Sequence, residues 1–109
     1  MATVKQLLEK ADYCGWAHYK DQDGDIEFSA YSPAGQDFSF NVCGDSAALM
    51  ISDLHNYIAN FDPVERASIW VGADGHGANG APDDPRDIIK DMEDCEDMMR
   101  DLLNEWRKL

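Results

Sequence analysis

The sequence has few Lys and Arg residues, and none of them lies between Lys20 and Arg66. Over 109 residues, 22 acidic side chains stand against 9 Lys and Arg, which gives a formal net charge of -13. Binding to nucleic acid depends on Lys and Arg that neutralise phosphates, so we expect no direct nucleic-acid ligand. The same charge argument excludes binding to anionic membranes.

Long apolar runs and paired cysteines are lacking as well. No run approaches the ~18 residues that a membrane helix needs, and the N-terminal residues are too polar for a secretory signal. Cys14, Cys43 and Cys95 are odd in number, far apart and without a CxxC pair, so a disulfide framework is not expected. These absences favour a cytoplasmic protein with no membrane partner.

Apolar and aromatic residues, in contrast, are plentiful. Hydrophobic residues make up 44% of the chain and include three Trp, four Phe and four Tyr, which is enough for one compact core. Acidic chains that stay disordered lack this content. We therefore predict a single domain over residues 1–109.

Two strands are predicted on either side of a turn at residues 32–35, where Pro33 and Gly35 suit the corner positions. Apolar residues occupy alternate positions in both strands, namely Ile26, Phe28 and Ala30 before the turn and Phe38, Phe40 and Val42 after it. That period of two is typical of strands with one buried face. With a further strand at 16–20, the segment is predicted to form an antiparallel meander of about three strands.

Apolar residues at helical spacing predict a helix at 3–13, a second one at 45–61 and a short third one at 62–70. A glycine-rich loop at 72–82 separates these from a long last helix at 84–108. The last two helices each begin with an Asp-Pro pair, the pattern of an N-cap followed by proline at the first helical position. This order predicts an α+β fold, in which a small antiparallel meander packs against three to four helices, the C-terminal one being long.

The last helix carries a continuous apolar seam, made of Ile88, Met92, Cys95, Met99, Leu102, Trp106 and Leu109. We expect the seam to cover the sheet, because a small sheet with one apolar face needs a helix to bury it. The alternative is a small accessory or regulatory module that docks another protein through its methionines, around Met92, Met98 and Met99. Both a monomer and a homodimer are compatible with this seam.

The acidic residues are segregated along the chain. Nine of them lie between Lys20 and Arg66, with no base among them: Asp21, Asp23, Asp25, Glu27, Asp37, Asp45, Asp53, Asp62 and Glu65. Strand alternation places Asp25 and Glu27 on the face away from the apolar residues. Carboxylates crowded on a rigid meander could occupy a basic groove built for DNA, helped by electrostatic steering, so we predict a DNA mimic. Acidity that serves only solubility is the alternative.

Motifs for other chemistry are incomplete. Asp21-Gln-Asp-Gly-Asp25 resembles a fragment of a calcium loop, but its glycine comes one place early and position 12 is Ser32 instead of Glu. The cysteines and histidines are isolated in sequence, so a zinc-stabilised binder stays a third alternative only. His76, in the glycine-rich loop, is the one residue to test for general-base chemistry. We expect no enzymatic activity, no cofactor and no bound metal.

Three phrases of the sequence resemble those of small proteins carried by phages and conjugative elements: Tyr31-Ser-Pro-Ala-Gly-Gln-Asp-Phe-Ser-Phe40, Asn60-Phe-Asp-Pro63 and Asn79-Gly-Ala-Pro82. In size, acidity and hairpin-plus-helix build, the chain is similar to antirestriction and anti-CRISPR inhibitors. The resemblance implies a protein that binds a DNA-targeting nuclease in the cytoplasm of a bacterial host and occupies its DNA path.

The resulting hypothesis is a non-enzymatic inhibitor of a bacterial defence nuclease, either a CRISPR effector or a restriction enzyme, that acts as an acidic DNA mimic. The predicted partner-binding residues are Asp21, Asp23, Asp25, Glu27, Tyr31, Asp37 and Asp53. Among them Tyr31 is expected to serve as an aromatic anchor.

Overall fold

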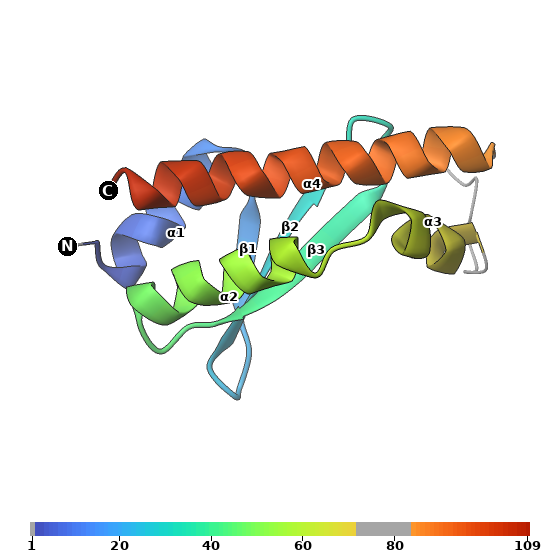
Figure 1. Ribbon diagram of the computed structural model, residues 1–109. Helices are drawn as coiled ribbons and strands as arrows, with labels where there is room; N and C mark the ends of the chain where they lie inside the picture. The colour runs from blue at the N-terminus through green and yellow to red at the C-terminus, as the bar shows by residue number, and fades with distance from the viewer. Residues whose placement is uncertain (1, 72–83) are drawn as a thin grey trace.

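The computed structural model describes residues 2–71 and 84–109, so the predicted loop at 72–82 and its His76 lie outside the described residues. In chain order the elements are α1 (Val4–Tyr13), β1 (Ala17–Lys20), β2 (Asp25–Tyr31), β3 (Asp37–Cys43), α2 (Ala47–Ala59), α3 (Pro63–Val71) and α4 (Pro85–Arg107). Figure 1 shows α4 running along the length of the molecule, beside α2 and α3. The predicted α+β class, with an antiparallel meander and a long C-terminal helix, is confirmed.

The sheet has the strand order β1-β2-β3, and both pairs of neighbours are antiparallel. Phe28 of β2 lies opposite Phe40 of β3, so the apolar residues of the two strands share one face. Gly35 in the turn between them has a φ of 88°, a left-handed conformation that glycine adopts without steric cost. Strand β1 starts one residue later than predicted, because the Trp16 N–H donates to the Ala11 carbonyl of α1 at 2.9 Å.

Side-chain caps start the helices. Thr3 and Gln6 form a complete capping box at α1, in which the backbone N–H of each donates to the side-chain oxygen of the other. Ser46 caps α2 through its hydroxyl group. The carboxylates of Asp62 and Asp84 accept hydrogen bonds from backbone N–H groups at the starts of α3 and α4. The predicted helix starts at the two Asp-Pro pairs are therefore confirmed.

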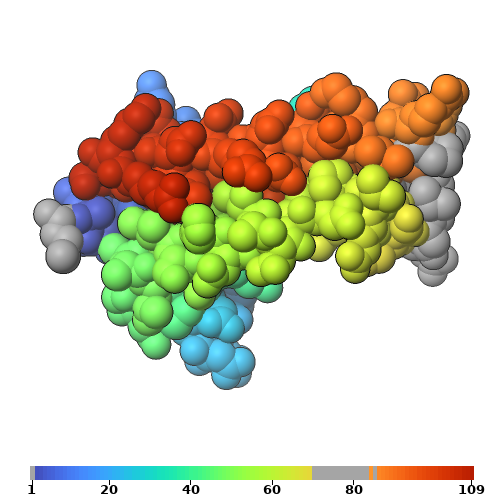
Figure 2. Space-filling view, viewed as in Figure 1, coloured from blue at the N-terminus to red at the C-terminus, as the bar shows by residue number. Residues whose placement is uncertain are grey.

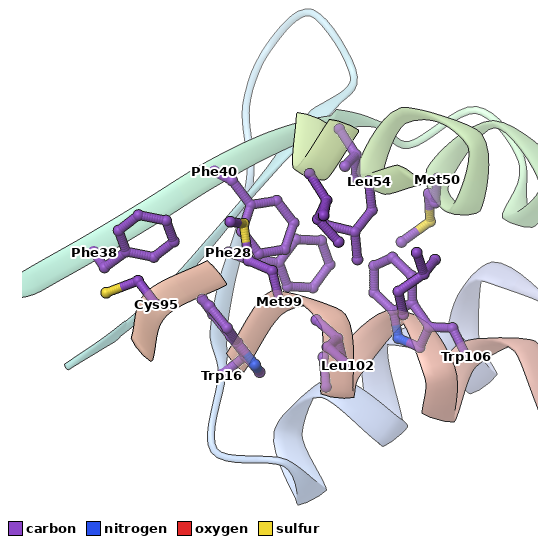
Figure 3. Close-up of a cluster of buried hydrophobic side chains, with 14 of the residues drawn as sticks. Trp16, Phe28, Phe38, Phe40, Met50, Leu54, Cys95, Met99, Leu102 and Trp106 are labelled. Carbon is purple, nitrogen blue, oxygen red and sulfur yellow. The ribbon is translucent and has the colours of Figure 1, made fainter. Parts of the chain in front are cut away.

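The helices cover one face of the sheet, and the side chains between the two layers form the core (Figure 3). The Phe28 ring lies 5.3 Å from that of Phe40 and 5.4 Å from that of Trp106, measured between ring centroids. Trp106 Nε1 donates to the Leu7 carbonyl at 3.0 Å, which joins α4 to α1. The predicted α4 seam is at most 2% exposed at Ile88, Met92, Cys95, Met99, Leu102 and Trp106. The seam therefore covers the sheet, as expected, and only Leu109 extends beyond the core, at 42% exposure.

A buried carboxylate joins α4 to the turn between β2 and β3. Asp91 is 3% exposed and accepts hydrogen bonds from Ser32 Oγ at 2.6 Å and from Ala34 N at 3.1 Å. Ser32 Oγ also accepts from Gln36 N at 2.9 Å. The turn is thereby fixed to the helix, and the adjoining ends of β2 and β3 are fixed with it.

Candidate functional site

The face of the sheet that points away from the helices is open. Along β2 the residues alternate between exposed and buried, and each outward residue lies opposite an outward residue of the neighbouring strand. The ten outward residues are Ala17, Tyr19, Asp25, Glu27, Ser29, Tyr31, Asp37, Ser39, Asn41 and Cys43. We call them the open sheet face. Antiparallel sheets commonly keep one face in solvent in this way.

The open sheet face carries three carboxylates, Asp25, Glu27 and Asp37, and no Lys or Arg. All three residues are exposed. Asp25 and Glu27 lie two residues apart on β2, a spacing of about 7 Å along the strand. Carboxylates without a cation among the other outward residues give this face a negative potential. The structure thus places three of the predicted partner-binding acids on one face of the sheet, with Asp25 and Asp37 at opposite ends of the β2–β3 pair.

Two tyrosines stand on the same face, Tyr19 at 66% and Tyr31 at 73% exposure. Tyr19 lies opposite Glu27, and Tyr31 lies opposite Asp37, so each ring has a carboxylate for a neighbour. Tyrosine is enriched at protein interfaces, because its ring supplies contact area and its hydroxyl group supplies a hydrogen bond. Sequence reasoning singled out Tyr31 but missed Tyr19, whose strand was predicted without a register.

The acidic residues of the β1–β2 turn have different roles. The Asp21 carboxylate accepts hydrogen bonds from Asp23 N at 2.9 Å and from Asp25 N at 3.0 Å, so it closes the turn. Gly24, with a φ of 89°, completes the turn, and a Cβ added to it would lie 3.4 Å from Asp45 Oδ1. Asp21 is therefore first of all a turn residue. Figure 2 shows the turn projecting past α2 in light blue, and Asp23 is exposed there.

Asp53, the remaining predicted acid, lies on α2 and not on the open sheet face. Its carboxylate accepts a hydrogen bond from Cys43 N at 2.8 Å, so it connects α2 to the end of β3. Part of its role is therefore structural. It also lines a groove of about 390 Å³ at the outer side of β3, where Asn41 belongs to both the groove and the open sheet face. Asp53 therefore lies beside the open sheet face, at the rim of this groove.

The groove itself is a feature that sequence reasoning missed. It lies where α2, α3 and β3 meet, and its lining includes the carboxylates of Asp53, Asp62 and Glu65. The rings of Tyr57 and Phe61 form part of its wall. Nine of its ten lining residues lie within residues 53–69, and the tenth is Asn41 of β3. They converge only through the orientation of α3 relative to α2 and β3, which no local pattern identifies. The only sequence signal was the run of acids without a base.

The methionines of α4 leave little apolar surface for docking. Met92 and Met99 are buried, and Met98 is partly buried against the core. The docking alternative therefore has no exposed methionine patch on the described part of α4. Since Met92 and Met99 already pack in the core, an apolar partner would have to detach the helix from the sheet to reach them.

Within the part of the chain that the structure describes, the thiols and imidazoles do not assemble into a metal site. Across residues 2–71 and 84–109, no three His, Cys, Asp or Glu side chains lie close enough to hold a metal ion. Cys95 is fully buried, and burial together with the nearby Asp91 carboxylate raises its pKa to about 12. Cys14, at the C-cap of α1, is exposed, although partial burial and the nearby Glu105 raise its pKa. A buried thiol with a high pKa is a poor nucleophile and metal ligand.

Comparison with known proteins adds no relative: neither protein-family models nor curated proteins nor solved structures match this chain. In the part of the chain that the structure describes, no helix is long and apolar enough to span a membrane.

Proposed function

We propose that this protein is a non-enzymatic inhibitor that binds a DNA-binding protein of bacterial defence, a CRISPR effector or a restriction enzyme, and takes the place of its DNA. The observation that carries the proposal is the open sheet face, with exposed carboxylates, two exposed tyrosines and no base among its ten residues. Such a surface is complementary to a basic channel. The choice of a defence nuclease follows from the resemblance to antirestriction and anti-CRISPR inhibitors.

The charge density of the face decides how far it imitates DNA. One strand of DNA carries a phosphate about every 3.4 Å of helix axis, whereas Asp25 and Glu27 on β2 are about 7 Å apart. The face therefore has roughly half the linear charge of one strand. Charge alone would give a fast but weak encounter, so the tyrosines have to supply the short-range contacts. Tyr19 lies opposite Glu27, and Tyr31 lies opposite Asp37, so each carboxylate that attracts the partner has a tyrosine beside it for short-range contact.

The overall charge supports the same partner. A formal net charge of -13 on 109 residues attracts a basic surface from a distance and repels nucleic acid. Attraction of this kind is screened within about 10 Å at 0.1 M salt. Complex formation should therefore be fast at low salt and should weaken as salt rises.

The test is a pull-down of the tagged protein from a bacterial lysate, washed in parallel at about 0.05 M and about 0.5 M salt, with retained proteins identified by mass. The test variant neutralises the open sheet face through Asp25→Asn, Glu27→Gln and Asp37→Asn. We expect the wild type to retain a DNA-binding protein that the high-salt wash removes. The test variant should retain much less of it.

A matched control removes the same number of charges from the exposed side of α4. Glu93→Gln, Asp97→Asn and Asp101→Asn affect three exposed carboxylates outside the open sheet face. Retention by the control should equal that of the wild type. If both variants lose the partner equally, then only net charge matters. If a partner without nucleic-acid function persists through the high-salt wash, the proposed function is wrong.

A further inference from the structure

The groove beside β3 has a more defined chemistry than the open sheet face. It has a volume of about 390 Å³, within the range of small-ligand sites. Two of its carboxylates are held in place by the backbone: Asp53 accepts from Cys43 N at 2.8 Å, and Asp62 accepts from Val64 N at 3.0 Å. Such bonds fix the position of the negative charges before a ligand arrives.

The charge of the groove is unbalanced. Asp53, Asp62 and Glu65 face a single cationic side chain in the lining, Arg66. The Arg66 guanidinium lies 5.7 Å from the Phe38 ring centroid and 6.0 Å from that of Phe61, which places it against aromatic rings. It makes cation–π contacts there and keeps its charge. Three carboxylates against one guanidinium leave an excess of negative charge in the groove. A cationic ligand is therefore favoured over an anionic or neutral one.

The aromatic wall specifies the kind of cation. The Tyr57 and Phe61 rings lie 6.1 Å apart at an angle of 34° and both line the groove. A planar guanidinium can stack on such a ring and can bond a carboxylate through two parallel N–H groups, whereas an ammonium group does neither. Asn56 on α2 and Asn60 at its C-cap add side-chain amide oxygens that can accept from the remaining N–H groups. Arg66 against Phe61 shows that this surface already accommodates a guanidinium.

We infer that the groove receives an arginine side chain of the partner protein. This inference rests on the proposed function, because the basic surface that meets the open sheet face supplies the arginine. The groove joins that face at Asn41, so one partner surface can reach both. The groove would then determine which basic proteins are bound, and the open sheet face would determine how fast they associate.

The probe is N-acetyl-arginine-methylamide, titrated into the ¹⁵N-labelled full chain and followed by NMR chemical shifts. The analogous citrulline compound has a planar but uncharged side-chain group, and the lysine compound has a charged group that is not planar. The arginine probe should saturate, with its largest shifts at the side-chain amides of Asn56 and Asn60. The lysine probe should bind about tenfold more weakly, and the citrulline probe should cause no saturable shift.

Two double variants distinguish binding in the groove from a general effect of negative surface charge. Asp62→Asn with Glu65→Gln removes two groove charges, and asparagine keeps the N-cap of α3. Glu93→Gln with Asp97→Asn removes two charges from exposed positions on α4. Arginine affinity should fall about tenfold in the groove variant and stay unchanged in the α4 variant. The inference would be overturned if the two variants lowered arginine affinity equally, or if the chemical-shift changes spread over the whole surface. It would also be overturned if the lysine probe bound as tightly as the arginine probe.

The probe experiment needs no partner, so its failure can be told apart from that of the proposed function. If pull-down depends on the open sheet face but the arginine probe does not bind the groove, then the arginine inference alone is wrong. If the probe binds the groove but no DNA-binding protein is retained, then the groove recognises arginine in another basic partner and the proposed function is wrong.

Discussion

Replacing Asp91 by alanine is expected to destabilise the protein far more than any other loss of a carboxylate on the described part of α4. Asp91 is 3% exposed and accepts two hydrogen bonds from the β2–β3 turn, from Ser32 Oγ at 2.6 Å and from Ala34 N at 3.1 Å. The alanine variant removes both bonds. It also leaves a hydroxyl and an N–H group at the turn without their partner.

The magnitude follows from these two bonds. Hydrogen bonds to a charged group contribute about 1.5–3 kcal/mol each, so the loss of both should lower the free energy of unfolding by about 3–6 kcal/mol. Asp91→Asn keeps an oxygen that accepts one bond and should cause roughly half of that loss. A control is Asp94→Ala, since Asp94 forms an ion pair with Lys90 four residues earlier at the helix surface. Pairs of this spacing at the helix surface are screened by solvent and contribute little to stability.

The assay is equilibrium unfolding in urea, followed by far-UV circular dichroism and tryptophan fluorescence together. The Asp91→Ala midpoint should fall strongly at an unchanged m-value, and the Asp94→Ala midpoint should stay close to that of the wild type. A loss below about 1 kcal/mol for Asp91→Ala would refute the reasoning, because the buried carboxylate would then not hold the turn. The same turn connects Tyr31 and Asp37, so the open sheet face depends on this anchor.

Three further outcomes test the fold around the site. Gly44→Ala should destabilise the folded protein by about 1–3 kcal/mol, because the added Cβ would lie 2.7 Å from the Gly24 carbonyl oxygen and 2.8 Å from Ile26 side-chain carbons. An unchanged midpoint of thermal unfolding would contradict this packing. A maleimide should modify the exposed Cys14 long before the buried Cys95, and equal labelling by mass would contradict the burial. The pKa of Cys95 is about 12 in the folded protein, whereas that of a free thiol is about 8.5. As the pH rises above about 8.5, only the unfolded chain therefore loses this proton. The free energy of unfolding should fall more steeply with pH in the wild type than in Cys95→Ala. An equal fall in the two proteins would count against the raised pKa.

The sequence predicted the elements well where the signal is local. Strict alternation around Phe28 and Phe40 identified β2 and β3, because side chains of a strand point to opposite faces in turn. The Asp-Pro pairs at Asp62 and Asp84 identified the starts of α3 and α4, since an N-cap bonds its own helix. Both signals depend on neighbours within a few residues. They do not require any knowledge of the tertiary structure.

Contacts between distant segments were not predictable in this way. Asp91 lies among the apolar residues of α4, and its partner Ser32 is 59 residues away, so no pattern near either residue indicates the bond. Asp53 was expected on the acidic surface, but its bond to Cys43 N places it beside β3. The groove arises only when α2, α3 and β3 meet. The open sheet face was predictable in β2, while Tyr19 became part of it only through the register of β1.

The most direct test of the central claim is competition with DNA on the captured partner. Labelled duplex DNA is bound to that partner, and the fluorescence anisotropy of the DNA is followed as the protein is added. We expect the protein to displace the DNA completely. The variant with Asp25→Asn, Glu27→Gln and Asp37→Asn should displace it only at much higher concentration. A stable complex that holds the DNA and the protein together would contradict the claim that the open sheet face occupies the DNA path.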